Sequence, residues 1–346
     1  MKAIGMCLIV YGHIAHATTV GLTPPVYLKQ FGVAFFLFST GFTLARERRS
    51  VVEVLFRRLF PVYFFGLSVA VLIAVTGAIR GSGLALSNFL PFAAGANILF
   101  DNFPANPTTW YIGTYIHFVL LWAWPLRRIR VRGWMIAVAV AMEIPIRALL
   151  IAFAGQYVAY MLLVNWTAVF LLGMAKGAED ERDAADSPIP YAAALALGLV
   201  AWAAAMRPLG FDPTFPFMTL SRWPATIGLV VVSAAISLLY VSTTRLVFEA
   251  TRRVEAPAPV RFVARNSLII FLAHMPVFFA LHPILVGWGL TYWARVGVQW
   301  VICVGGLGAV SEAIHAVINI DRLRARAFEM LTGRRRPQVD GEALAS

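Results

Sequence analysis

Charged residues are scarce in this sequence. They make up 13% of its 346 residues, with only 17 Asp and Glu against 29 Lys and Arg. A soluble globular domain carries about a quarter charged residues, so the composition excludes an ordinary soluble protein. The two cysteines, Cys7 and Cys303, both lie in apolar stretches. We expect them to be buried thiols rather than a disulfide or metal ligands.

The sequence motifs of several large enzyme classes are also missing. The chain has no Gly-x-Ser-x-Gly, Walker or dinucleotide-binding pattern. His13 and His16 are three positions apart, but no further His, Cys or acidic residue follows them at metal-ligand spacing. We therefore expect no metal site and no permanently bound cofactor.

Hydrophobic residues dominate instead, at 60% of the chain and a mean hydropathy of +0.75. Apolar runs repeatedly reach the ~18 residues that indicate a transmembrane helix, so we expect an all-α polytopic membrane protein. The segment 84–100 contains Pro91 and Gly95 and predicts a re-entrant or interfacial piece rather than a crossing. About ten spans are predicted, at residues 3–20, 29–45, 59–79, 109–126, 133–154, 158–176, 189–206, 223–244, 266–286 and 294–320.

Basic residues gather in every second connection between the predicted spans. The exceptions are Lys29, Arg80, Arg147, Arg207, Arg222 and Arg295. By the positive-inside rule the basic face is cytoplasmic and holds both termini, as in a bacterial-type cytoplasmic (inner) membrane. Topology then explains the net charge of +12 without a nucleic-acid partner. Residues 1–325 form the predicted transmembrane domain, and residues 326–346 form a polar cytoplasmic tail that we expect to be disordered.

His13, inside the first apolar span, is the strongest functional signal. Ionisable side chains at membrane depth usually face a bundle interior or a wet cavity. Lys2 lies eleven residues earlier on the same predicted helix, roughly 16 Å away at 1.5 Å per residue. The topology places His117 and His274 at a similar depth. Any of these histidines could be a packing residue, but a desolvated neutral imidazole can also accept a proton.

Glu143 and Arg147 form the one strongly charged pair deep within a predicted span. Their i, i+4 spacing puts them on one helix face, where they can neutralise each other, and Pro145 between them would open the backbone. The pair could pack helices or contact a substrate. A carboxylate partner for His13 must come from another helix, and Glu143, Asp101 and Glu312 are the candidates.

Four segments resemble the acyltransferase-3 family of multispanning membrane O-acyltransferases. KAIGMCLIVYGH, from Lys2 to His13, is similar to its opening basic residue followed by ten residues and a histidine. The other three are FGVAFFLFSTGFTL from residue 31, RRLFPVY from residue 57 and NSLIIFLAHMPV from residue 266. The segment TTWYIGTYIHF from residue 108 is a weaker match. The resemblance extends from Lys2 to Asn319, and it is carried by the order and spacing of these segments rather than by any one of them.

The sequence departs from the family pattern at several of these positions. Lys2 stands where the family usually has arginine, and Thr40 where it usually has serine. Arg57 and Arg58 are adjacent, whereas the family often has two spaced arginines. Tyr115 stands where many members carry glutamate, which puts the acceptor site in doubt. Whether a short segment precedes the first residue is left open.

The resemblance implies transfer of an acyl group, most often acetyl, from cytoplasmic acyl-CoA to a hydroxyl of a saccharide or glycolipid acceptor. His13 would be the general base. His274 and Glu143 would complete the catalytic set, and Lys2, Arg46, Arg57 and Arg58 would bind the phosphates of acyl-CoA. Trp110, Tyr111, His117 and Arg147 would contact the acceptor, although the aromatic residues also suit an interfacial belt. Acyl-CoA, the acceptor and membrane lipid are the expected partners.

A proton-coupled transporter or flippase of a lipid-linked or amphipathic substrate is the alternative. In it the histidines and Glu143 would form a proton relay. Transporters commonly show internal repeats and paired broken helices, and the sequence shows neither. The identity of the acceptor, the acyl chain length, an acyl-enzyme intermediate and the oligomeric state are left open by the sequence.

Overall fold

The computed structural model describes residues 1–18, 28–79, 81, 94–96, 110–179, 187–206 and 226–333. Over these ranges the chain is helical and contains no strand. Asp101, the segment 84–100 apart from 94–96, and residues 207–222 lie outside the described residues. The helices are α1 (Lys2–Thr18), α2 (Leu28–Ala45), α3 (Val51–Ile79), α5 (Trp110–Ala123), α6 (Gly133–Phe153), α7 (Gln156–Met161), α8 (Thr167–Ala178), α9 (Ile189–Met206), α10 (Thr226–Thr251), α11 (Ala258–Gly287), α12 (Tyr292–Val301), α13 (Leu307–Val317) and α14 (Ile320–Thr332).

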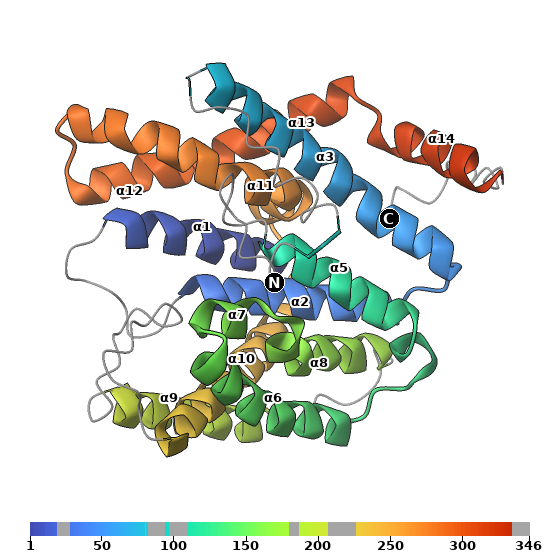
Figure 1. Ribbon diagram of the computed structural model, residues 1–346, viewed down its shortest axis with the longest axis vertical. Coiled ribbons are helices and arrows are strands. Elements are labelled where there is room, and N and C mark those ends of the chain that lie inside the picture. Colours follow the sequence, from blue (N-terminus) through green and yellow to red (C-terminus); the bar gives the residue numbers. More distant parts are fainter. Residues whose placement is uncertain are drawn as a thin grey trace.

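Helices α1 and α2 pack side by side across the middle of the bundle (Figure 1). On one side of this pair, α8 and α10 pack against α2, α6 packs against α8 and α10, and α9 packs against α10. On the other side, α11 packs against α1 and is covered by α3, α12 and α13. The central pair therefore contacts both halves of the bundle, and a side chain on α1 can meet one from the distant α11.

Five helices in the described ranges are long and apolar enough to cross a membrane. They are Val51–Ile79, Gly133–Phe153, Ile227–Thr251, Ala258–Gly287 and Tyr292–Val317. The apolar side chains of Val71, Leu72, Val75 and Ile79 on α3 are exposed, as expected of a surface that faces lipid. Lys2–Ile14, Leu163–Ala178 and Ile189–Ala204 are apolar but shorter. The all-α membrane architecture is confirmed, whereas the count of ten spans and the orientation of the termini stay predictions.

The predicted span 158–176 is not one continuous helix. It is divided into α7, a 3₁₀ turn at Leu163–Trp166 and α8. Asn165 lies at this break, and its side-chain amide donates to the Ala159 carbonyl of α7. A backbone break at membrane depth is tolerated where other groups satisfy the freed polar atoms. The break places the N-terminus of α8 inside the bundle, within reach of polar side chains from α6.

Glycines allow the closest helix contacts in the bundle. A Cβ atom on Gly173 of α8 would overlap the Phe38 carbonyl of α2, and one on Gly41 of α2 would overlap the Phe170 carbonyl of α8. Gly5 and Gly32 make the same kind of approach between α1 and α2. Small residues are the usual means by which membrane helices bring their backbones together, because packing rather than water drives their association. These glycines therefore fix the spacing of α1, α2 and α8.

Two features near the C-terminal end were not predicted. A π-helical turn at Ile302–Gly306 joins α12 to α13, so the predicted span 294–320 is one helix with a local bulge. The second is α14, which continues through Thr332. The start of the segment predicted as a tail is thus helical, because Ile320 and Phe328 are buried on one face of it. Residues 334–346 lie outside the described ranges.

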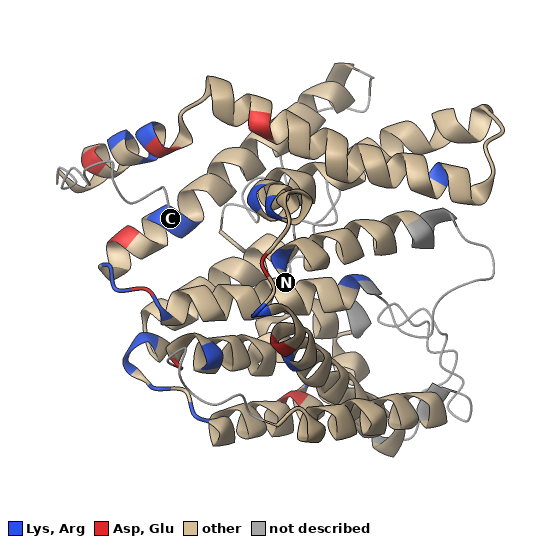
Figure 2. Cartoon of the chain, turned by 180° about the vertical axis from the view of Figure 1, so that it is seen from behind, with Lys and Arg blue, Asp and Glu red and all other residues tan. Residues whose placement is uncertain are grey.

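Most Lys and Arg residues lie toward one end of the bundle (Figure 2). The long helices run roughly in the plane of this view, so the basic end corresponds to one set of their termini. The N-terminus, in contrast, lies midway along the long helices in both views (Figures 1 and 2). Lys2 therefore begins α1 partway along the bundle rather than at its end, where its exposed side chain lines a cavity described below.

Candidate active site

His13 and His274 form a hydrogen-bonded pair between α1 and α11. The Nδ1 atom of His13 lies 2.9 Å from the Nε2 atom of His274. Their rings are stacked at a centroid distance of 5.1 Å with an interplanar angle of 26°. His274 is fully buried, whereas His13 is half-buried. The sequence analysis placed these residues at a similar depth, and the fold brings them into contact.

The backbone of α11 fixes the tautomer of both rings. The Nδ1 atom of His274 lies 2.8 Å from the Phe271 carbonyl oxygen and 3.1 Å from that of Ile270. A carbonyl oxygen can only accept, so this Nδ1 carries a hydrogen, and Nε2 of the neutral ring is an acceptor. His13 must then donate from Nδ1. The lone pair of neutral His13 is consequently on Nε2, which is the nitrogen that can take up a proton.

Cys303 contacts the same histidine from the other side of α11. Its Sγ atom lies 3.6 Å from the backbone carbonyl oxygen of His274, and the thiol is buried. Cys303 belongs to the π-helical turn, and such turns are frequent at functional sites. Cys303 is a buried thiol, as the sequence predicted. Its contact with the carbonyl oxygen supports the backbone at His274.

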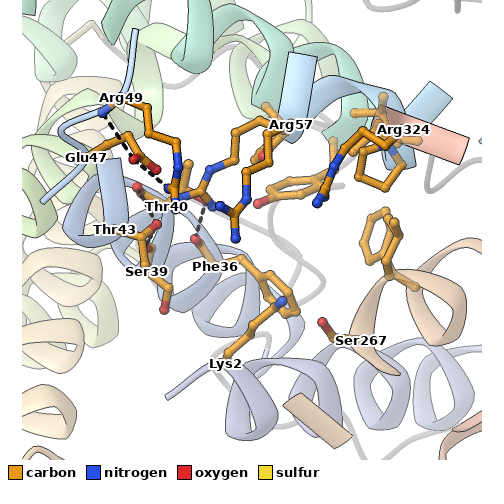
Figure 3. Close-up of a pocket in the computed structure, with 18 residues that line it drawn as sticks. Lys2, Phe36, Ser39, Thr40, Thr43, Glu47, Arg49, Arg57, Ser267 and Arg324 are labelled. Carbon is orange, nitrogen blue, oxygen red and sulfur yellow. Dashed lines mark hydrogen bonds and ion pairs between the residues drawn. The ribbon is translucent and has the colours of Figure 1, made fainter. Parts of the chain in front are cut away.

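A basic cavity of about 390 Å³ lies between α2, α3, α5 and α11 (Figure 3). Lys2 points into it from one side, and Arg57 and Arg324 point into it from the opposite side. Glu47 is its one acidic group among the described lining residues, and it is bound to Arg49 at 2.8 Å. The cavity therefore keeps a net positive charge. Its cationic lining residues are Lys2, Arg49, Arg57, Arg58 and Arg324.

Tyrosine and threonine hydroxyl groups on α5 and α2 form part of the cavity wall. Tyr115 of α5 lines the cavity beside Arg58, and Tyr111, one turn earlier, lines it with Thr40 of α2. The amine of Lys2 lies close enough to Arg58 for their charges to interact. Tyr115 and Thr40 are both positions at which the sequence departs from the family pattern, and both departures keep a polar group in the cavity. Unlike a glutamate, the neutral phenol at position 115 leaves the positive charge of Arg58 uncompensated.

Phe271 lies between the cavity and the histidine pair, and neither His13 nor His274 lines the cavity itself. This residue lines the cavity, its carbonyl accepts the hydrogen bond from His274, and its ring lies 6.0 Å from the His274 ring. Ser267, one turn earlier on α11, also lines the cavity. One face of α11 thus leads from the basic cavity to the imidazoles, and a ligand with an anionic end and a reactive end could bridge the two.

A second basic cavity, of about 680 Å³, shares a wall with the first. Lys2, Ser39 and Thr43 line both, so the end of α2 separates them. Arg46 lines this second cavity and not the first. Its Nε atom donates to the Gly177 carbonyl at 3.1 Å, and its guanidinium lies 4.3 Å from the centre of the Phe42 ring. Of the four predicted acyl-CoA ligands, Lys2, Arg57 and Arg58 are therefore together, and Arg46 is separate.

Glu143 and Arg147 lie in a different, fully buried network. Glu143 accepts a hydrogen bond from the Ala168 backbone N–H at 2.7 Å and another from Ser237 at 2.9 Å. Arg147 donates to the Ser233 carbonyl and to Ser237, at 2.8 and 2.9 Å, and its ion pair with Glu143 measures 3.7 Å. The carboxylate thus accepts from a free N–H at the buried N-terminus of α8, where negative charge is favoured. These contacts join α6, α8 and α10, and neither residue lines either basic cavity.

The remaining predicted site residues are placed as follows. Tyr111 lines the first cavity, but Trp110 packs against Tyr160 with ring centroids 4.8 Å apart. His117, on the same helix, lines neither cavity and is half-buried. Glu312 is bound by Arg265 and Asn266. The side chain of His16 lies outside the described side chains. Within the described residues His13 is hydrogen-bonded to His274, and Asp101 lies outside them.

Arg324 and Arg49 are cavity residues that the sequence analysis assigned to topology alone. No spacing rule could have singled out Arg49 among so many arginines. Arg324 has one signal in the sequence, because it stands between Ile320 and Phe328 at helical spacing and so shares their buried face. Within the described residues, no group of three His, Cys, Asp or Glu side chains could hold a metal ion.

Residues 1–311 match the acyltransferase domain that defines the acyltransferase-3 family. This match covers most of the chain and includes both histidines and Arg57 and Arg58. The protein therefore belongs to the acyltransferase-3 family, and it is a membrane acyltransferase. No curated protein and no solved structure matches the chain.

Proposed function

We propose that the protein transfers an acetyl group from cytoplasmic acetyl-CoA to a hydroxyl of a saccharide or glycolipid, with His13 as the general base. The observation that carries this proposal is the hydrogen bond between His13 and His274. It directs the lone pair of His13 to Nε2. The same logic operates wherever a second group fixes the tautomer of a catalytic imidazole.

The first basic cavity, which we call the donor cavity, suits the phosphates of acyl-CoA. Acyl-CoA carries a pyrophosphate and a 3′-phosphate, and guanidinium groups bind such oxyanions through paired hydrogen bonds. Arg57, Arg58 and Lys2 converge on one space. The thioester end would then extend along the Ser267–Phe271 face of α11 toward the imidazoles.

The chemical step follows from this arrangement. Nε2 of His13 takes the proton of the acceptor hydroxyl as its oxygen attacks the thioester carbonyl carbon. The resulting tetrahedral intermediate collapses with cleavage of the C–S bond, and the imidazolium returns the proton to the CoA thiolate. His274 accepts from Nδ1 of His13 throughout and so stabilises the imidazolium. General base catalysis of this kind contributes on the order of 10²–10⁴ in rate.

The acceptor would approach from the side of α5. Tyr111 lines the cavity and lies 5.2 Å from the Phe271 ring, measured between ring centroids. Aromatic rings suit stacking on a sugar. Trp110 and His117 would also contact the acceptor, whereas Arg147 would act only indirectly, by positioning α6 and α8. The basic end of the bundle supports an inner-membrane orientation with the donor cavity toward the cytoplasm (Figure 2).

The proposal is tested with the purified protein in detergent and radiolabelled acetyl-CoA. Release or exchange of label is compared between wild type, His13→Ala and the control His315→Ala, which alters a histidine on α13. We expect turnover by wild type and by His315→Ala and its loss in His13→Ala, with equal CoA binding in all three. Turnover by a folded His13→Ala variant at the wild-type rate would remove His13 from the mechanism. An absence of acetyl-CoA binding by wild type would instead favour a transporter.

A further inference from the structure

We propose that Arg324, on the C-terminal helix α14, binds a phosphate group of the acyl-CoA donor. The proposal rests on the proposed function, since it assigns a ligand to the donor cavity. The helix follows residues 1–311, the part of the chain that matches the family. A donor contact from α14 would therefore be an addition made by this chain's own C-terminal segment.

The position of Arg324 on its helix points it inward. Ile320, Arg324 and Phe328 are spaced by four residues and so share one face. Ile320 is buried in a cluster with Val62 and Phe65 of α3. Phe328 packs against Phe56 of α3 with a ring-centroid distance of 5.4 Å. Arg324 thus lies between two anchors on the docked face, where an apolar residue would be expected.

Both ends of α14 are fixed by local sequence. The Asn319 side chain accepts a hydrogen bond from the Arg322 N–H at 2.8 Å, which caps the N-terminus. Gly333 ends the helix with φ = 65°, a conformation that glycine adopts at low cost. These caps and the two buried anchor residues prevent α14 from rotating about its own axis. The direction of Arg324 is consequently set by the fold.

The charge of Arg324 remains directed toward the cavity. Its side chain is 14% exposed and lines the cavity together with Arg57 and Arg58 (Figure 3). Its ion pair with Asp321 involves a carboxylate that is 81% exposed, and such pairs are weak because the acid keeps its hydration. Cations gathered around one cavity repel one another, and a bound phosphate would relieve that repulsion.

Topology alone does not account for this placement. Arg322 and Arg326 lie on the opposite face of the same helix and are exposed. They satisfy the preference for basic residues near the cytoplasmic face without entering any cavity. They also provide matched controls, because each has the same charge and the same helix as Arg324.

The test compares Arg324→Met with Arg326→Met in acetyl-CoA turnover by the purified full-length protein. Methionine keeps an unbranched apolar side chain, so the docking of α14 is preserved. We expect about a tenfold or greater rise in KM for acetyl-CoA in Arg324→Met with little change in kcat, because one charge-assisted hydrogen bond is lost. Arg326→Met should behave as wild type. Arg324→Lys should lie in between, since lysine keeps the charge but not the paired donors.

A second substrate shows which phosphate group of acyl-CoA Arg324 contacts. With 3′-dephospho-acetyl-CoA, the difference between wild type and Arg324→Met disappears if Arg324 binds the 3′-phosphate, and persists if it binds the pyrophosphate. Either result supports a phosphate contact. Equal KM values for Arg324→Met and Arg326→Met, with wild type active, overturn the inference and leave the proposed function intact. If wild type neither binds nor turns over acetyl-CoA, the proposed function has failed instead.

Discussion

The imidazoles of His13 and His274 share a hydrogen bond across 261 positions of the chain. The backbone carbonyl groups of Phe271 and Ile270 decide its direction, because they leave Nε2 of His274 as the acceptor. The environment of His274 thereby fixes which nitrogen of His13 donates. If His13 is the base, as proposed, the two residues should respond together to mutation.

Replacement of His274 should therefore mimic the loss of the base while His13 is still present. In His274→Leu the Nδ1–H of His13 has no acceptor, and the preferred tautomer is lost. We expect kcat for acetyl transfer to fall on the order of 100-fold. In His274→Gln, an amide oxygen can still accept, so we expect a smaller loss. Single-turnover kinetics with labelled acetyl-CoA would measure both. Equal activity of His274→Leu and wild type would disprove the coupling.

Glu143 offers a test that separates structure from catalysis. In Glu143→Leu, the N-terminus of α8 loses its acceptor, and Arg147 keeps an uncompensated buried charge. Breaking a buried pair in this way costs about 3–5 kcal/mol, so the thermal midpoint in detergent should fall sharply. Glu143→Gln keeps an acceptor for the Ala168 N–H and should be more stable than Glu143→Leu. If Glu143→Gln folds as wild type does but lacks activity, the carboxylate has the direct catalytic role that the sequence suggested.

The contact between α2 and α8 should be sensitive to a single methyl group at Gly173. In Gly173→Ala the new Cβ would overlap the Phe38 carbonyl, and overpacking of this kind costs about 1–3 kcal/mol. Gly297→Ala on α12 is the matched control, because a Cβ there meets nothing within 4 Å. Thermal unfolding in detergent should show a lower midpoint for Gly173→Ala alone. Equal midpoints would mean that the two helices can separate at little cost.

The hydroxyl of Tyr115 should affect donor affinity through Arg58. Tyr115→Phe removes a hydroxyl that lines the cavity with this guanidinium, and we expect a few-fold rise in KM for acetyl-CoA. Tyr115→Glu restores the residue type found in many relatives, but its carboxylate would pair with Arg58 and compete with phosphate. Its KM should therefore exceed that of Tyr115→Phe. A lower KM for Tyr115→Glu than for wild type would contradict this account of the cavity.

The positions of individual helices could be predicted from hydrophobic length. The span 29–45 corresponds to α2 at Leu28–Ala45, and the two histidines of the pair were placed at a similar depth. Their contact could not be predicted, because it depends on how α1 and α11 are rotated and packed. The break before α8 and the π-helical turn were also missed, since Asn165 and Gly306 leave no periodic signal in an apolar run.

For the charged residues, too, the sequence predicted some features and not others. A positive-inside pattern explains why basic residues lie in certain connections, but it treats all of them alike. Only the docked face of α14 distinguishes Arg324 from Arg326, and only the cavity geometry separates Arg46 from Arg57. The predicted pairing of Glu143 with Arg147 was found, whereas its link to the N-terminus of α8 required the three-dimensional structure.

The shared wall between the two basic cavities has a practical consequence for the interpretation of Lys2. Its amine borders both spaces, so a substitution at this position changes the electrostatic potential of each at once. A loss of activity in a Lys2 variant would therefore combine the effects on both cavities. An assay that assigns a ligand to one compartment needs residues that border only that compartment, such as Arg57 for the first and Arg253 for the second.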